Sequence, residues 1–388
     1  MSQLPDFIGP AALGIKMGAI LPGSNLKQMI LDRIKECEKL GLTDEGDIIC
    51  ITESVVARAQ KNFVSLNRVC QEISEKLDLK PEDNLGVLFP IISRNRFSLI
   101  LKALARTVSR GQITLQLSFP TDEVGNQLIA EETLKRLNKT AQDTISYSEI
   151  EDSSFAHPIT GVDYLQYYQQ IIEKEGAEAR IILCNRPEEI QNHNPKAVIA
   201  ADIHSRHKTK KLIEKIVPNC ITLDEICNQG KVSSPWGLLG SNLSAEDKLK
   251  LAPKNGDLFV KNLQQKLLDA TGKKFHLLIY GDGAYKDPTT GIYELADPQT
   301  IFGATPELKN RFREGVKYKY LADKMHASGK DAREIEEMIA KEQQFSKKDF
   351  ETEGTTPRKI TDLLASLADL VSGSADAGTP VILVKNFL

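Results

Sequence analysis

Short apolar runs alternate with amphipathic segments along most of this chain. Runs such as Ile48–Thr52 and Ala197–Ala201 are too short to be helices, and segments with helical spacing, such as 97–108, separate them. Short buried strands that alternate with helices are typical of layered α/β folds. We therefore predict an α/β fold, in which mixed α+β sheets are packed against helices. Further strands are predicted at 87–92, 113–119, 180–184, 275–280 and 380–384, and further helices near 26–34, 163–175, 207–217 and 360–371.

The charge balance and the lack of long apolar runs limit the classes of partner. The 388 residues include 50 basic and 53 acidic side chains, for a net charge of −3, whereas a general nucleic-acid binder carries a basic excess. No apolar run approaches the ~20 residues that span a bilayer, and the first residues lack the pattern of a signal peptide. The six cysteines show no metal-binding spacing and are expected to be reduced thiols. We expect a cytoplasmic protein with neither a nucleic-acid nor a membrane partner.

The length allows either two domains or one domain with an insertion. Residues 301–354 are strongly charged, with Lys-rich and Glu-rich stretches at helical spacing. We predict that 301–354 forms a charged helical insertion or lobe, and that 1–300 and 355–388 together form the core.

Carboxylates follow three of the predicted strands. Asp122 lies in the segment 118–126 together with Asn126, Asp282 lies between two glycines, and Asp202 precedes His204 and His207. Because ligands of open α/β sheets bind at strand ends, these carboxylates are candidates for holding the divalent cations of phosphate chemistry. Each also has a structural interpretation.

The structural alternatives are specific for each loop. Asp122 can stabilise a turn while its neighbouring amide caps the following helix, and Gly-Asp-Gly is a common turn signal. The two histidines beside Asp202 can begin a solvated helix, or they can bind a metal together with that carboxylate, as in a metal-dependent hydrolase.

Two arginines, Arg94 and Arg96, flank Asn95 at the start of the helix predicted at 97–108. Guanidinium groups at a helix start suit a carboxylate or a phosphate group. The sequence contains no Walker-type loop, no Gly-x-Gly-x-x-Gly and no Gly-x-Ser-x-Gly, so any nucleotide site is of another kind.

Several segments, in the same order, resemble the γ-glutamyl ligases of the deazaflavin coenzyme F-420. The segment 45–60 is similar to a family segment in which Gly-Asp and a strand precede Thr-Ser-Lys. The C-terminal segment 363–384 is similar to the family's last helix, glycine-rich turn and strand. The other matching segments are 7–23, 121–126 and 280–291.

The resemblance implies a reaction. Those ligases use GTP, with Mg or Mn and a monovalent cation such as K, to phosphorylate a substrate carboxylate, and the amine of L-glutamate then attacks the acyl phosphate. For this chain it implies an F420-ligase-like fold with an additional helical insertion, GTP or ATP as co-substrate, a cofactor as acceptor, and a homodimer.

The resemblance also implies roles for particular residues. It makes Asp122 and Asp282 the metal ligands. We expect Arg94, Arg96 or the loop 202–207 to recognise the carboxylates of the acceptor or of glutamate. Asp122, Asp282, Arg94 and Arg96 together form the predicted catalytic set. The nucleotide contacts that carry over are Ser54, Arg58, Asn126, Leu13 and Gly14.

The chain departs from the family pattern at a few positions. Gly283 replaces a threonine, Glu53-Ser54 replaces a Ser-Lys pair, Arg58 replaces a lysine, and Ser374 replaces a polar or acidic residue. These departures leave the acceptor open between the deazaflavin coenzyme and a folate-type cofactor. They also leave open the alternative that the protein is a non-catalytic relative, which binds a nucleotide or metabolite.

Overall fold

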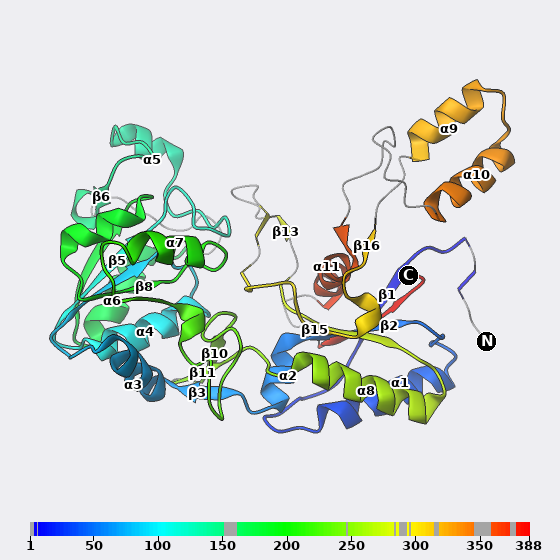
Figure 1. Cartoon of the computed structure of the whole chain (residues 1–388), viewed down its shortest axis with the longest axis horizontal. Coiled ribbons are helices and arrows are strands. Elements are labelled where there is room, and N and C mark those ends of the chain that lie inside the picture. Colours follow the sequence, from blue (N-terminus) through cyan, green and yellow to red (C-terminus); the bar gives the residue numbers. More distant parts are fainter. Residues whose placement is uncertain are drawn as a thin grey trace.

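The computed structural model describes residues 4–5, 7–150, 161–245, 247–282, 285–286, 293–294, 296–313, 318–344, 358–372 and 378–388. Two sheets dominate it, one of five strands and one of six, and each lies in a lobe of its own (Figure 1). We call them the five-stranded lobe and the six-stranded lobe. The α/β fold predicted from the sequence is confirmed.

The five-stranded lobe combines both ends of the chain. Its sheet has the order β1-β18-β2-β12-β15, in which β2 and β12 are parallel and the other neighbours are antiparallel. The strands are β1 (Ala11–Ile15), β2 (Ile48–Thr52), β12 (His276–Tyr280), β15 (Ile301–Ala304) and β18 (Val381–Lys385). The helices are α1 (Leu26–Lys39), α2 (Glu53–Ala59), α8 (Gly256–Thr271) and α11 (Ile360–Ser372).

The central strands of this sheet are buried on both faces. In β2, Ile49 and Ile51 pack in the same core as residues of α1 and α8, whereas Ile48 and Cys50 pack with residues of α11 on the opposite face. This two-sided burial explains why the sequence shows a continuous apolar run rather than alternation.

The described residues between 63 and 251 form the six-stranded lobe, whose sheet has the order β6-β7-β5-β4-β8-β9. All neighbours are parallel except the short edge strand β6. In chain order the five parallel strands have the order 3-2-1-4-5, which is that of a doubly wound sheet. The strands are β4 (Asn84–Leu88), β5 (Gln112–Leu117), β6 (Ile145–Ser146), β7 (Glu178–Leu183), β8 (Ala197–Ala200) and β9 (Cys220–Thr222).

Helices cover both faces of this sheet. The larger core includes α3 (Leu66–Leu77), α4 (Phe97–Thr107) and α6 (Tyr164–Lys174), and a smaller core on the other face includes α7 (Arg206–Ile213) and the 3-10 helix η2 (Pro187–His193). The remaining elements of this lobe are α5 (Glu131–Arg136), η1 (Tyr147–Glu149) and η3 (Leu223–Glu225).

A small sheet lies where the chain passes between the lobes. It has the order β10-β11-β3, with β3 (Phe63–Ser65), β10 (Asn242–Ala245) and β11 (Lys248–Lys250). The side-chain amide of Asn62 donates to the carbonyls of Ser233 and Ala252, both at 2.9 Å. The bond to Ala252 joins the two points at which the chain enters and leaves the six-stranded lobe.

The predicted charged insertion at 301–354 contains two packed helices, α9 (Tyr318–Ala327) and α10 (Ala332–Gln344), which lie away from both sheets (Figure 1). Its first residues form β15 and the 3-10 helix η4 (Pro306–Leu308) within the five-stranded lobe. The boundary between core and insertion stays a prediction. The short strands β13 (Tyr285–Lys286), β14 (Tyr293–Glu294), β16 (Phe312–Arg313) and β17 (Arg358–Lys359) complete the described elements.

Candidate functional site

A polar cavity of about 750 Å³ lies at the junction of the two lobes, and we call it the interlobe cavity. The five-stranded lobe contributes the ends of β2 and β12, the start of α2 and the segment before β18. The six-stranded lobe contributes the start of α4 and residues of β10 and β11. Among the lining residues are Ser54, Arg58, Arg96 and Asp282, four of the residues proposed from the sequence.

An arginine joins the lobes across this cavity. Arg96 immediately precedes α4, and its guanidinium group donates to Oδ2 of Asp282 at 2.6 Å and to Oδ1 of Asp297 at 2.7 Å. The second oxygen of Asp297 accepts from the backbone N–H of Asp282 at 2.8 Å. We call these three residues the arginine clasp. It is a largely desolvated network, because the Asp297 side chain is 1% exposed and that of Arg96 is 16% exposed.

The charged side chains of the clasp shift one another's pKa values. Burial, and then the nearby Asp297 carboxylate, raise the pKa of Asp282 to about 7, although Arg96 opposes the shift. Burial disfavours the arginine charge, but the two aspartates outweigh that effect and raise the pKa of Arg96. The clasp therefore holds a permanent cation against a carboxylate that titrates near neutral pH.

The clasp needs a glycine before Asp282. A Cβ at Gly281 would lie 2.3 Å from Oδ2 of Asp297 and 2.7 Å from the ring of Phe302. We expect Gly281→Ala to lower the free energy of unfolding by about 1–3 kcal/mol, because the buried carboxylate has to move. Gly9→Ala is the matched control, since a Cβ there meets no atom within 4 Å. Urea denaturation measures both, and equal stabilities would contradict the described packing.

A second ion pair lies in the wall of the cavity. Lys250 of β11 donates to Oε1 of Glu53 at 2.6 Å, and both side chains are more than nine-tenths buried. Burial raises the pKa of Glu53, and the Lys250 charge opposes that shift. The other oxygen of Glu53, Oε2, is buried and accepts no hydrogen bond from any described residue. Its free lone pairs make Glu53 a candidate proton acceptor.

The remaining polar groups of the cavity suit a small anionic ligand. Arg58 of α2 is exposed, and within the described part of the chain it forms no ion pair. Thr379, just before β18, has a buried hydroxyl that also lacks a partner among the described residues. Cations, carboxylates and free hydrogen-bonding groups therefore converge from both lobes.

The donor set of the cavity is compatible with a magnesium or manganese nucleotide. The described residues contain no group of three or more Asp, Glu, His or Cys side chains arranged to hold a metal. Magnesium is usually held by only one or two protein carboxylates, and the phosphates of its nucleotide supply further ligands. Asp282 supplies one such carboxylate, whereas both oxygens of Asp297 are already bonded within the clasp, so the residues fit this mode of binding with Asp282 as the protein ligand.

Asp122 and Asp282 do not line the same cavity. Asp122 is 6% exposed and accepts four hydrogen bonds, from the backbone N–H groups of Ile92, Val124 and Asn126 and from the side-chain amide of Asn126. Burial raises the pKa of Asp122 to about 6 against these four bonds. The geometry is that of a turn stabiliser, which was the structural alternative for this segment.

Four other predicted residues do not line the interlobe cavity, and one of them is Asn126, whose side-chain amide donates to Asp122. Arg94 is exposed two residues before the clasp arginine. Leu13 and Gly14, on β1, line a separate cavity with residues of α1. Gly283 and Ser374, where the chain departs from the family pattern, lie outside the described residues.

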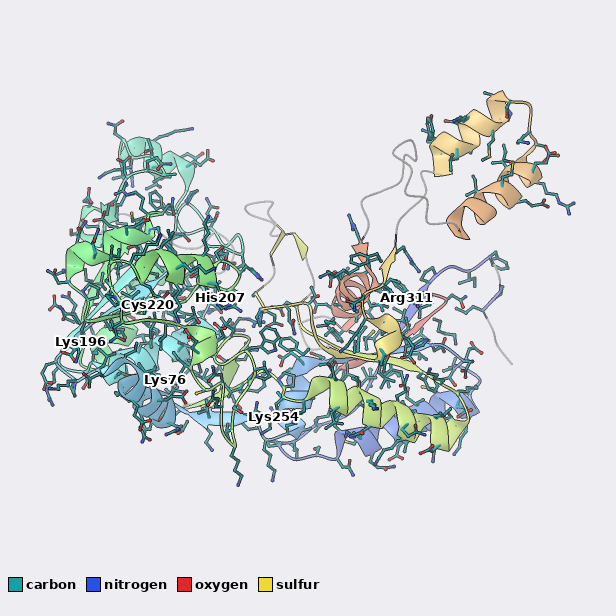
Figure 2. The ribbon with its side chains drawn as sticks, viewed as in Figure 1. Lys76, Lys196, His207, Cys220, Lys254 and Arg311 are labelled. Atoms are coloured by element: carbon teal, nitrogen blue, oxygen red, sulfur yellow. The ribbon has the colours of Figure 1, made fainter. Side chains whose placement is uncertain are left out.

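The loop that contains Asp202, His204 and His207 does not show the geometry of a metal site. Asp202 accepts from the hydroxyl of Thr209 at 2.9 Å, and His207 is exposed and lies 3.8 Å from Asp224. Figure 2 shows that His207 lies on the six-stranded lobe, apart from the place where Lys254 marks the junction with the five-stranded lobe. The hydrolase alternative therefore has no support within the described residues.

Sequence reasoning missed Lys250 and Asp297, and it treated Glu53 only as a departure from the family pattern. No local pattern points to the two missed residues. Lys250 lies in a short strand of alternating polarity, and Asp297 lies in an irregular loop. Each lies far from its partner in the sequence, at separations of 197 and 201 residues.

These features define a two-lobed α/β protein with a charged cavity for small polar ligands at the junction of its lobes. The family model described as F420-0:Gamma-glutamyl ligase matches residues 14–386, which include both lobes. The chain therefore belongs to the F420-0:gamma-glutamyl ligase family. Membership implies γ-glutamyl ligase activity, and hence an enzyme that acts on small molecules.

Two further findings concern relatives of the chain and membrane-spanning helices. A search of curated proteins found no match to this chain. Within the described ranges, no helix is both long and apolar enough to cross a membrane.

Proposed function

We propose that the protein is a nucleotide-dependent γ-glutamyl ligase that adds L-glutamate to a carboxylate of a cofactor, through an acyl phosphate, in the interlobe cavity. The observation that carries the proposal is the convergence of Arg58, Arg96, Glu53 and Asp282 from two lobes on one cavity. Ligases that join two substrates at the expense of a nucleotide need such a mixture of cations and carboxylates.

The proposed chemistry has two steps. An oxygen of the acceptor carboxylate attacks the terminal phosphorus of GTP or ATP, and the bond to the departing nucleoside diphosphate breaks. The amine nitrogen of L-glutamate then attacks the acyl carbon, the C–N bond forms, and inorganic phosphate leaves. Magnesium or manganese bound to Asp282 and the nucleotide would neutralise charge on the transferring phosphoryl group.

Residues of the cavity have separate roles in this scheme. The exposed guanidinium group of Arg58 binds a phosphate or a carboxylate of the substrates, because no described side chain competes for it. Oε2 of Glu53 accepts the proton that the glutamate amine loses, since burial raises the pKa of this carboxylate toward the range of a general base. Lys250 holds Glu53 in place through its other oxygen.

The proposal is tested with purified protein, GTP or ATP, Mg²⁺ or Mn²⁺, L-glutamate, and either the deazaflavin coenzyme or a folate-type cofactor. We expect nucleoside diphosphate and a product lengthened by one glutamyl unit, both measured by mass spectrometry. Glu53→Gln is expected to slow turnover about 10²-fold or more. The proposal is wrong if neither acceptor is extended and no diphosphate forms with either nucleotide.

One observation favours a non-catalytic relative as the second candidate. The Asp282 oxygen that would face a cation is already paired with Arg96 at 2.6 Å. In that case calorimetry would show nucleotide binding, whereas the assay above would show no turnover with either acceptor.

The clasp also predicts how Mn²⁺ binding depends on pH. A metal needs the ionised carboxylate, and Asp282, with its pKa near 7, faces Arg96, Asp297, Glu53 and Asp369. We expect the affinity for Mn²⁺ in the presence of nucleotide to fall about tenfold per pH unit below 7 and to level off above it. Electron paramagnetic resonance titrations at pH 6 and pH 8 measure the change. A constant affinity over this range would exclude Asp282 as a ligand.

A further inference from the structure

A second cavity lies at the point where the doubly wound sheet reverses its strand order. Strands β4 and β8 are adjacent and parallel, but the chain leaves β4 toward β5 on one side and reaches β8 only after β7. Ligands of such sheets bind beyond the carboxyl ends of the strands at this reversal. A cavity of about 330 Å³ lies there, and we call it the switch-point cavity. Residues that follow β4, β5 and β8 line it.

The backbone at this point is held in an uncommon conformation. Phe89, the first residue after β4, has a φ of 51°, in the left-handed region that residues other than glycine seldom adopt. Its backbone N–H donates to the carbonyl of Gln116 at 2.9 Å. Such conformations are concentrated at ligand-binding sites, because the surrounding structure has to maintain them.

The anion position of the switch-point cavity is already filled by the protein itself. The Glu123 carboxylate accepts from the backbone N–H groups of Ile203, His204 and Ser205, at 2.6, 3.0 and 2.7 Å, directly before α7. In a doubly wound sheet such N–H groups are the usual phosphate site. A phosphate would have to displace this carboxylate, so the cavity is not organised for a phosphorylated ligand.

Among the described residues that line this cavity, Asp202 has a buried oxygen that lacks a partner. It is 2% exposed, and its Oδ2 atom accepts from the Thr209 hydroxyl at 2.9 Å, whereas its buried Oδ1 atom accepts from no described residue. The guanidinium group of Arg206 is directed elsewhere, to Asp224 and to the carbonyl of Ile203. Leaving such an oxygen unpaired costs about 1–3 kcal/mol, which a ligand with a suitable donor would recover.

The charges around the cavity identify the kind of donor. Its carboxylates belong to Asp122, Glu123 and Asp202, and its cation, Lys208, is exposed. Burial, and then the Glu123 charge, favour the neutral form of Asp202 and raise its pKa to about 7. A cationic donor would relieve both effects, because it pairs with Oδ1 and offsets the excess of negative charge.

We propose that the switch-point cavity binds a small molecule with a primary ammonium group, which donates to Oδ1 of Asp202. The site is separate from the interlobe cavity and shares none of its lining residues. The proposal does not depend on the ligase reaction.

The test compares ethanolamine with choline, which carries the same charge but has no N–H donor. Ligand-observed NMR on the full-length protein gives the two dissociation constants. We expect choline to bind about tenfold more weakly or worse, and Asp202→Asn to weaken ethanolamine binding by at least about the same factor. Asp78→Asn, which removes an exposed aspartate from the same lobe, is the matched control and should bind ethanolamine like the wild type.

A second measurement avoids any effect of Asp202→Asn on folding. In the wild-type protein the carboxyl ¹³C resonance of Asp202 should shift when ethanolamine is added and stay in place when inorganic phosphate is added. Equal binding of ethanolamine and choline, an unmoved Asp202 resonance, or a response to phosphate instead would each overturn the proposal.

Discussion

Asp282→Asn is expected to lower kcat for γ-glutamyl bond formation about 10²- to 10³-fold and to leave the protein folded. Asparagine keeps the size of the side chain but removes the carboxylate charge from the interlobe cavity. Arg96 retains its bond to Asp297, so the arginine clasp keeps one of its two ion pairs. The rate of nucleoside diphosphate release gives kcat, and thermal denaturation shows that the variant is folded.

Asp122→Asn is the informative comparison, because the resemblance to the family gave both aspartates the same role. The Asp122 carboxylate accepts four hydrogen bonds within its own loop. We expect this variant to lose about 1–3 kcal/mol of unfolding free energy, since buried donors lose their acceptor, while its folded fraction stays active. The reverse pattern, unchanged stability with lost metal-dependent turnover, would restore Asp122 as a metal ligand.

Arg96→Met is expected to lower the free energy of unfolding by about 3–5 kcal/mol. The substitution removes the cation from the arginine clasp and leaves Asp282 and Asp297 as two neighbouring carboxylates without compensation. Removing one partner of a buried ion pair is more destabilising than removing the whole pair. Chemical denaturation, followed by circular dichroism, measures the loss.

Arg94→Met provides the matched control for the clasp. Arg94 lies two residues earlier, has the same side chain and is exposed. Its substitution should change stability by less than about 0.5 kcal/mol. Two variants of equal stability would show that the clasp does not hold the lobes together in solution.

The sequence predicted the elements of the fold well, because burial leaves a local pattern. Strands buried on both faces appear as short apolar runs, and the predicted 48–52 and 197–201 match β2 and β8 to within one residue. The strand predicted at 87–92 instead spans 84–88 and ends before Pro90, which has no N–H to donate to a sheet. The division into two lobes was not predicted, since chain reversals between distant segments leave no such periodic signal.

The candidate site was only partly predictable. The segment similar to the family led to Ser54 and Arg58, and acidic or basic residues at element ends led to Asp282 and Arg96. Asp122 resembles Asp282 in the sequence, since each is a carboxylate shortly after a predicted strand. What separates the two is the supply of nearby backbone N–H groups, which depends on loop conformation and not on residue type.

The arginine clasp has a consequence for motion. The chain crosses between the lobes twice, and both crossings lie together: the N–H of Leu251 donates to the carbonyl of Asn62 at 2.9 Å. Paired crossings of this kind are the place at which a hinge motion of one lobe relative to the other would be absorbed. The arginine clasp lies across the interlobe cavity, which such a motion would widen. A substrate anion that binds Arg96 in place of Asp282 would therefore weaken the contact between the lobes and widen the cavity that it enters.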